Sequence, residues 1–334
     1  MKRSFEELLN ELATSEKFQT TNLYMLSRMN QEDLNIFRNI WPTVPTQRRR
    51  DIMQELVEIA EFNFEVDYDP IFLLGLGDED ADVRVSAISG LWEQENPELI
   101  EPLVHLLRTD PVVMVRAAAA SALGQFINLR ELQEIEHYPA LLAEEALLET
   151  IREANEHVEV RRRAVEAIAF SSEADVISII ENAYYDSDEK MQVSAIFAMG
   201  RNADKRWQPR VIAELDNPNS EIRFEAARAC GELEAVEAVP KLIQLIDEDP
   251  DLEVQEIAIG ALGRIGGPEA RSVLEIYLEN EIEALALAAD EALYELNLFS
   301  GSFDLFEFDD GFDDDMEEFY EVDDLNDNGN GYHS

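Results

Sequence analysis

The chain has 334 residues, of which 73 are Asp or Glu and 26 are Lys or Arg, so its net charge is −47 when the histidines are neutral. This charge argues against nucleic acid as the main partner, because a phosphate backbone is repelled unless basic groups gather on one face. It argues equally against an anionic membrane surface. Apolar residues make up 46% of the chain, which is enough to build a core and excludes a chain that is disordered throughout.

Three features bear on localisation. The first residues, Met1 to Glu7, turn acidic before an apolar segment can form, so we expect no signal peptide. No run of about 18 apolar residues occurs, so we expect no membrane span and no membrane partner. The single cysteine, Cys230, excludes an intramolecular disulfide and suits a reducing compartment. Together they predict a cytoplasmic protein.

Residues 1–69 are predicted to form an N-terminal helical cap. Residues 34–41 form an apolar-periodic run that stops at Pro42, and residues 52–60 form a clear amphipathic helix. Helices of this kind can cover the apolar end of a repeat array. The basic run at residues 48–50 leaves a partner-specific module open as the alternative.

Residues 70–298 are predicted to form a repeat array, because one phrase occurs there seven times. It reads as an apolar residue, Arg or Gln, two residues, Ala, two residues, a small residue, an apolar residue and often Gly. The position of the Arg or its equivalent is 84, 116, 161, 192, 223, 255 and 286. Five of the six steps are 31 or 32 residues, a regularity that indicates a solenoid or a related repeat architecture.

Each repeat is predicted to be a helix, a turn and a second helix. The phrase itself has amphipathic helical spacing, and a second apolar-periodic run such as residues 99–107 precedes it. Turns such as Asp110-Pro111, Asn217-Pro218 and Asp249-Pro250 lie between the two runs. Proline ends the first helix there, and the Asp or Asn can cap the next. No alternating strand pattern occurs in this region.

The phrase resembles the short HEAT-like repeat, of the kind first named from the phycobilisome lyases, over about residues 70 to 297. The resemblance implies an all-α fold, namely a right-handed superhelical α-solenoid of about seven helix pairs. For function it implies a non-catalytic scaffold or adaptor that binds a protein partner along its concave face. The phrase is specific for architecture and says little about chemistry.

The one long step, from position 116 to 161, contains about 14 extra residues near 124–137. Insertions in solenoids map to loops on one face, often the binding face. We therefore expect a loop here, which either contributes to binding or is merely tolerated.

Residues 299–334 are predicted to be a disordered, acidic tail. From residue 300 onward the chain has 13 acidic residues and no Lys or Arg. Aromatic residues such as Phe303 and Phe306 are interspersed among the acids. Such a segment cannot bury enough surface to order itself alone.

Two sets of arginines recur in the array. Arg84, Arg116, Arg161 and Arg223 occupy the same place in the repeated phrase, and we predict a structural ladder in which each reaches an acid of a neighbouring repeat. An anion-binding groove is the alternative reading. A second set is predicted to form the partner-binding site on the exposed face of the second helices: Arg162, Arg163, Phe197, Arg201, Phe224 and Arg228.

The second set gives an excess of positive charge in an otherwise acidic chain. It therefore predicts a protein partner with an acidic segment, and the acidic tail could dock there in the same molecule.

Enzymatic alternatives come from the families that share these repeats. Deoxyhypusine hydroxylases carry paired His-Glu motifs in several repeats, whereas Glu136-His137 and Glu156-His157 here do not recur at the repeat period. Bilin lyases use the same phrase, and nothing else in the sequence indicates a bilin. We expect no catalytic residues, no metal and no cofactor. A lyase-type enzyme or enzyme subunit remains the first alternative, and a metal-dependent hydroxylase or oxidoreductase the second.

Overall fold

The computed structural model describes residues 5–14 and 20–300. The described residues form an all-α solenoid and contain no strand. The chain divides into two units, Met1–Leu296 and Asn297–Ser334. The first unit contains the N-terminal helices and the repeat array, whereas the predicted disordered tail lies outside the described residues from position 301 onward.

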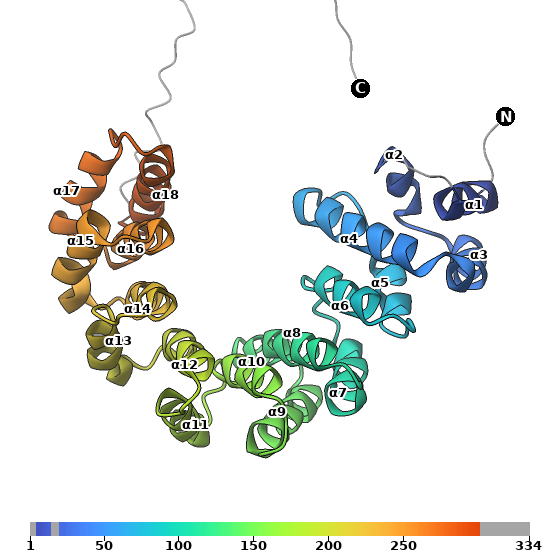
Figure 1. The fold of residues 1–334 in the computed structure, drawn as a ribbon, viewed down its shortest axis with the longest axis horizontal. Coiled ribbons are helices and arrows are strands. Elements are labelled where there is room, and N and C mark those ends of the chain that lie inside the picture. The colour runs from blue at the N-terminus through green and yellow to red at the C-terminus, as the bar shows by residue number, and fades with distance from the viewer. Residues whose placement is uncertain (1–4, 15–19, 301–334) are drawn as a thin grey trace, which may run out of the picture. The chain divides into compact units, whose positions relative to one another are not determined.

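Seven helix pairs follow one another along the array, in the number and register that the repeat phrase predicts (Figure 1). The first helices of the pairs are α5 (Asp69–Gly75), α7 (Ile100–Thr109), α9 (His137–Arg152), α11 (Ala174–Tyr184), α13 (Gln208–Glu214), α15 (Val239–Glu248) and α17 (Pro268–Tyr277). The second helices are α6 (Ala81–Gly90), α8 (Val113–Glu131), α10 (Val158–Ile168), α12 (Glu189–Asn202), α14 (Ser220–Glu232), α16 (Leu252–Ile265) and α18 (Glu283–Ser300).

From α6 to α14, each second helix packs on the second helix of the next pair, and from α6 to α16 each also packs on its own first helix. The pairs therefore form two layers, one of first helices and one of second helices (Figure 1). Short 3-10 turns lead into three of the first helices: Pro97–Leu99, Lys205–Trp207 and Val236–Ala238.

Small residues allow neighbouring second helices to pack closely. The alanine three positions after each Arg-equivalent residue has no exposed surface in any of the seven repeats: Ala87, Ala119, Ala164, Ala195, Ala226, Ala258 and Ala289. Because these positions lack larger side chains, neighbouring helices approach closely, and the rows of methyl groups leave little void between them.

Polar side chains set where the second helices begin. The Asp80 carboxylate accepts hydrogen bonds from the backbone N–H groups of Asp82 and Val83, and Asp188 does the same for Lys190 and Met191. Asn219 and Asp251 cap α14 and α16 with one such bond each, from the backbone N–H groups of Glu221 and Glu253. These caps satisfy N–H groups that a helix start leaves without partners.

The N-terminal region extends the two-layer stack. It contains α1 (Phe5–Thr14), α2 (Thr20–Leu23), the 3-10 turn Tyr24–Leu26, α3 (Gln31–Ile40), the 3-10 turn Trp41–Thr43 and α4 (Thr46–Phe62). Helix α4 packs on α6.

The basic run of α4 fixes it to the first repeat. Arg49 is buried, and its Nη2 lies 2.6 Å from Glu79 Oε1 while its Nε lies 3.2 Å from Asp78 Oδ2. Arg50 binds both oxygens of Asp80, at 2.9 and 2.6 Å. These two arginines therefore hold the turn between α5 and α6.

The prediction of a loop near residues 124–137 is wrong. The extra residues lengthen α8 to 19 residues and α9 to 16, and only residues 132–136 connect them. A buried ion pair explains the regular structure: Arg130 donates to both carboxylate oxygens of Glu144, at 2.7 and 3.1 Å, and Glu144 also accepts the Ser171 hydroxyl at 2.7 Å. The insertion is therefore part of the core between α8, α9 and α10.

Candidate binding surface on the second helices

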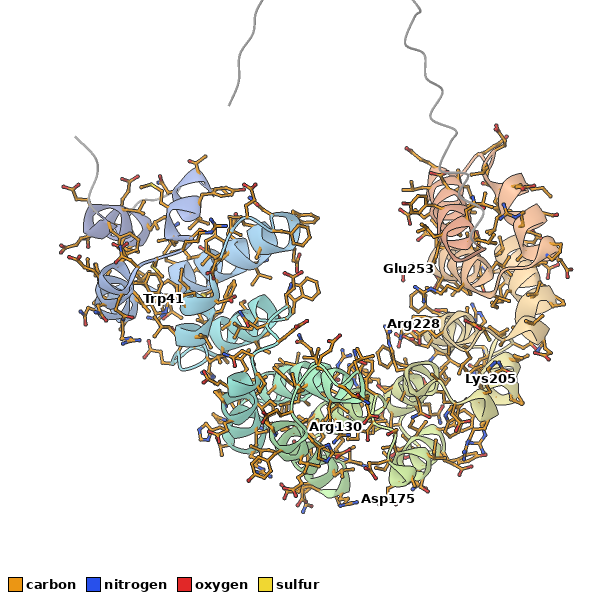
Figure 2. The ribbon with its side chains drawn as sticks, turned by 180° about the vertical axis from the view of Figure 1, so that it is seen from behind. Trp41, Arg130, Asp175, Lys205, Arg228 and Glu253 are labelled. Atoms are coloured by element: carbon orange, nitrogen blue, oxygen red, sulfur yellow. The ribbon has the colours of Figure 1, made fainter. Side chains whose placement is uncertain are left out.

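The side of the second helices that faces away from the first helices is named here the second-helix face. Figure 2 shows Arg228 of α14 on this side and Asp175 of α11 on the opposite side. Residues one and five positions after the Arg-equivalent residue lie on this face, and Ser89 and Ser121 are exposed there. These positions follow from the helical period.

The arginine ladder connects successive repeats at three of its four predicted positions. Arg84 donates to both oxygens of Asp110 at 2.8 and 2.9 Å, and Arg223 donates to Asp249 at 2.6 and 2.8 Å. Arg116 reaches both oxygens of Glu156, at 3.0 and 2.7 Å. Each bidentate pair joins a second helix to the turn of the next repeat.

The same arginines also hold their own turn. Each donates a third hydrogen bond, of 2.8 Å, to a backbone carbonyl six residues earlier, at Asp78, Asp110 or Asn217. Gln192 and Gln255 make the equivalent bond to Asp186 and Asp249, at 2.7 and 2.6 Å. Glutamine therefore preserves the hydrogen bond to the turn but does not form the ion pair to the next repeat.

Two acids of the ladder, Asp249 and Glu156, have lowered pKa values. Burial raises the pKa of Asp249, but hydrogen bonds from Arg223 and from the Asp251 backbone outweigh it and leave the pKa below its ordinary value. The pKa of Glu156 is lowered against burial in the same way, by Arg116 and the His157 backbone.

Arg161 differs from the other ladder positions. Its Nε is buried without a hydrogen-bond partner, and no ion pair to it occurs within the described residues. Asp186, at the place where the partner acid would stand, lines the same cavity of about 320 Å³ without pairing with Arg161. The ladder is therefore interrupted between the third and fourth repeats.

The six predicted partner-binding residues lie on three adjacent helices, α10, α12 and α14. Arg228 lies over the Phe197 ring at 4.3 Å from its centroid, and Arg201 lies over it at 5.4 Å. Phe197 is half-buried between them. Phe224 is half-buried on the same face of α14, with no arginine stacked on its ring in the part of the chain that the structure describes.

Carboxylates neutralise every arginine of this set. Arg162 pairs with Glu159 at 2.5 Å and Glu166 at 3.2 Å, and Arg163 lies 2.7 Å from Glu166. On α14, Arg228 contacts Glu225 and lies 3.9 Å from Glu232, which is 3.5 Å from Arg201.

The expected excess of free positive charge on this surface is therefore wrong, because each of the four arginines lies against a glutamate of α10 or α14. Spacing of three and four residues on one helix brings the opposite charges together. An acidic partner segment would have to compete with these glutamates. The same holds for the acidic tail, whose residues from 301 onward lie outside the described part of the chain.

One of these carboxyl groups has an unusual proton affinity. Burial raises the pKa of Glu225 to about 7, and the nearby Glu166 and Glu232 raise it too, while Arg228 and Arg201 lower it. Both carboxylate oxygens of Glu232 are buried without a hydrogen-bond partner. The cluster is consequently a partly desolvated charge network on the second-helix face.

An apolar groove on the same face was not predicted. It has a volume of about 470 Å³ and is lined from α6 and α8 by Val85, Ile88, Ser89, Trp92, Met114, Ala117, Ala118, Ser121, Ala122 and Gln125, with Glu159 and Arg163 at its α10 edge. Trp92 is 54% exposed and Met114 is 57% exposed. The sequence contains a signal that could have indicated this groove: Trp92 lies eight residues after Arg84, at a position where four other repeats have Gly.

Three further features bear on nucleophilic chemistry, metal binding and membrane insertion. Burial raises the pKa of the Cys230 thiol to about 12, as expected of a core cysteine and not of a nucleophile. Among residues 5–14 and 20–300, no three side chains of His, Cys, Asp or Glu are grouped so that they could bind a metal ion. None of the helices in this part of the chain is both long and apolar enough to cross a membrane.

Comparison with known proteins agrees with the repeat architecture. Deoxyhypusine hydroxylase of Candida albicans is 29% identical over 108 residues, which cover 32% of this chain and 34% of the hydroxylase. Phycocyanobilin lyase subunit alpha of Nostoc is 29% identical over 114 residues, which cover 31% of this chain and 41% of that subunit. The chain thus spans less than half the length of either curated relative.

Among solved structures, human deoxyhypusine hydroxylase in complex with glycerol matches 88% of this chain and 96% of its own length, at 16% identity and a TM-score of 0.37. A family model for HEAT repeats matches residues 70–144, 178–259 and 208–294, which together make up more than half of the chain. With the seven helix pairs and their buried alanines, this match shows that the chain belongs to the family of HEAT-repeat proteins.

Proposed function

We propose that this chain is a non-catalytic, cytoplasmic protein-interaction scaffold whose partner binds along the second-helix face. The observation that carries the proposal is the groove between α6 and α8, where Trp92 and Met114 are both more than half exposed. Large apolar side chains exposed together mark interaction sites, and tryptophan is enriched among residues that dominate binding energy.

The construction of the array supports a binding role. The buried alanine rows and the arginine ladder fix the second helices relative to one another. A surface held in this way loses little conformational freedom on binding, which favours affinity. The single buried cysteine is compatible with a reducing compartment.

An enzyme or enzyme subunit of the bilin lyase type is the alternative, and the similarity to a lyase subunit over 114 residues is the observation in its favour. That similarity covers only 41% of the subunit, and shared repeats alone account for the phrase. A hydroxylase is the weaker alternative. Metal analysis and an absorption spectrum of the purified protein distinguish the three: a stoichiometric chromophore supports the lyase, a stoichiometric transition metal supports the hydroxylase, and a scaffold has neither.

Quantitative co-purification tests the scaffold. Wild-type protein is compared with Trp92→Ala/Met114→Ala and with the control Ile276→Ala/Tyr138→Ala, which removes exposed apolar side chains from α17 and α9. We expect one set of proteins to be recovered with the wild type and the control and to be lost with the groove variant. Equal recovery with all three would show that the groove is not the binding surface.

A further inference from the structure

A second cavity adjoins the apolar groove and shares Trp92 with it. It has a volume of about 240 Å³ and lies between the end of α4, the start of α5 and the end of α6. Its wall includes Phe64, which is 80% exposed, together with the buried rings of Tyr68 and Phe72. Gln94 lines this cavity and Gln125 lines the groove, and the Gln125 amide donates to the Gln94 carbonyl at 3.4 Å.

Three carboxylates line the second cavity: Asp67, Asp69 and Glu93. None of them has an ion pair within the described residues, whereas Asp110, Glu156 and Asp249 of the ladder each bind an arginine. The hydrogen bond that Arg28 makes to this segment comes from its backbone N–H, which donates to the Asp67 carbonyl at 3.0 Å.

The partners that these acids do have are neutral. Asp69 accepts the Gln94 side-chain amide, and Asp67 accepts the Asp69 backbone N–H at 3.1 Å. Burial raises the pKa of Asp69, with a further contribution from Asp67, although the Gln94 hydrogen bond opposes it. A cation placed among these carboxylates would relieve that cost.

Exposed aromatic rings beside carboxylates are suited to a cationic side chain. The face of Trp or Phe attracts an ammonium or guanidinium group, and the carboxylates add direct charge pairing. The apolar groove on the other side of Trp92 is suited to an aliphatic or aromatic side chain. The net charge of −47 would also draw a cationic segment toward this surface.

From this arrangement we propose that the composite surface around Trp92 recognises a partner segment in which an apolar side chain stands next to a Lys or Arg. The apolar side chain occupies the groove between α6 and α8, and the cation occupies the cavity between Phe64 and Trp92, against Asp69 and Glu93. This inference rests on the proposed scaffold function and names the chemistry of its partner.

Three short fluorescein-labelled peptides test it by fluorescence anisotropy with the full chain. The mixed peptide alternates Leu and Arg with Ser spacers. In the apolar peptide every Arg is replaced by Gln, and in the basic peptide every Leu is replaced by Ser. At a salt concentration of about 0.15 M, which screens long-range attraction, we expect the mixed peptide to bind most tightly.

Variants test separately whether the cavity binds the cation and whether the groove binds the apolar side chain. Asp69→Asn/Glu93→Gln should weaken the mixed peptide by about tenfold or more, as expected for loss of a partly desolvated charge pair, and should leave the apolar peptide unchanged. Glu145→Gln/Glu237→Gln removes the same charge from exposed positions on α9 and beside α15, and should change binding by less than about twofold. Trp92→Ala should weaken all three peptides.

The outcomes separate the inference from the scaffold proposal. Equal weakening by both acid variants would show that only long-range charge attracts the peptides, and the inference fails. Binding of the apolar peptide as tightly as the mixed one would remove the cation from the recognition, and the inference fails while the groove remains a binding site. The co-purification experiment with Trp92→Ala/Met114→Ala tests the scaffold proposal independently of both peptide results.

Discussion

Gly231 on α14 lies against Ala261 on α16 so closely that a Cβ added to the glycine would be 2.9 Å from the Ala261 Cα. The same relation joins Gly200 to Ala229, at 3.0 Å. Each pair consists of the glycine that closes one repeat phrase and the small residue of the next phrase. The glycine is therefore required by helix proximity.

Gly231→Ala should destabilise the protein by about 1–3 kcal/mol, because the added methyl group meets backbone that cannot move without shifting α16. Gly260→Ala on α16 is the matched control, since nothing lies within 4 Å of its added Cβ. It should stabilise the protein by up to about 1 kcal/mol through helix propensity. Urea unfolding followed by circular dichroism measures both, and a loss of stability with the control or none with Gly231→Ala would contradict the packing described here.

Ala195→Leu should cost about 1–3 kcal/mol, because a fully buried alanine in the middle of α12 leaves no room for a larger side chain. The same unfolding measurement checks it. A change within experimental error would mean that the register of the repeat phrase is wrong at this helix.

Arg84→Ala should destabilise the protein by about 3–5 kcal/mol, because it leaves Asp110 buried without its partner. Arg108→Ala removes an ion pair of similar length, 2.7 Å to Glu149, that is exposed, so its cost should stay below about 1 kcal/mol. A similar loss in the free energy of unfolding for the two variants would show that the buried ladder pair stabilises the protein no more than an exposed ion pair does.

Glu225 should make the stability depend on pH around neutrality. Its pKa is about 7 in the folded protein against an ordinary value of 4.5, so the folded state binds the proton more tightly than the unfolded state. Its contribution is fully present below about pH 4.5 and is lost as the pH rises through 7. The stability difference between wild type and Glu225→Gln should therefore shift in favour of the variant over this range, and a difference independent of pH would contradict the raised pKa.

The sequence was sufficient for the parts of the fold that local periodicity determines. The spacing of the ladder arginines predicted the helix pairs and, for Arg84, Arg116 and Arg223, a link to an acid of the next repeat, because every repeat imposes the same geometry. It did not reveal that Arg161 lacks such a link. The insertion was predicted wrongly because its order depends on the buried Arg130–Glu144 pair, which joins residues that no repeat period relates.

The binding surface was predicted only in part. Arg228 was identified on the correct face, and its pairing with Glu225 and Glu232 follows from spacings of three and four residues on one helix, which the prediction left out. Only the approach of Glu232 to Arg201 of α12 depends on how the helices pack. Trp92 interrupts the phrase where Gly is usual. Its exposure follows from the end of α6 at Gly90, which the periodicity did not reveal.

Site-specific photocrosslinking tests the central claim most directly. A photoreactive amino acid is placed at Met114 in the groove and, separately, at Ile276, which is 71% exposed on α17 in the layer of first helices. If the partner binds through the second-helix face, position 114 gives a discrete crosslinked partner that disappears when Trp92→Ala is added, and position 276 gives no such adduct. A partner captured equally from both positions, or captured from position 114 regardless of Trp92, would contradict binding through the second-helix face.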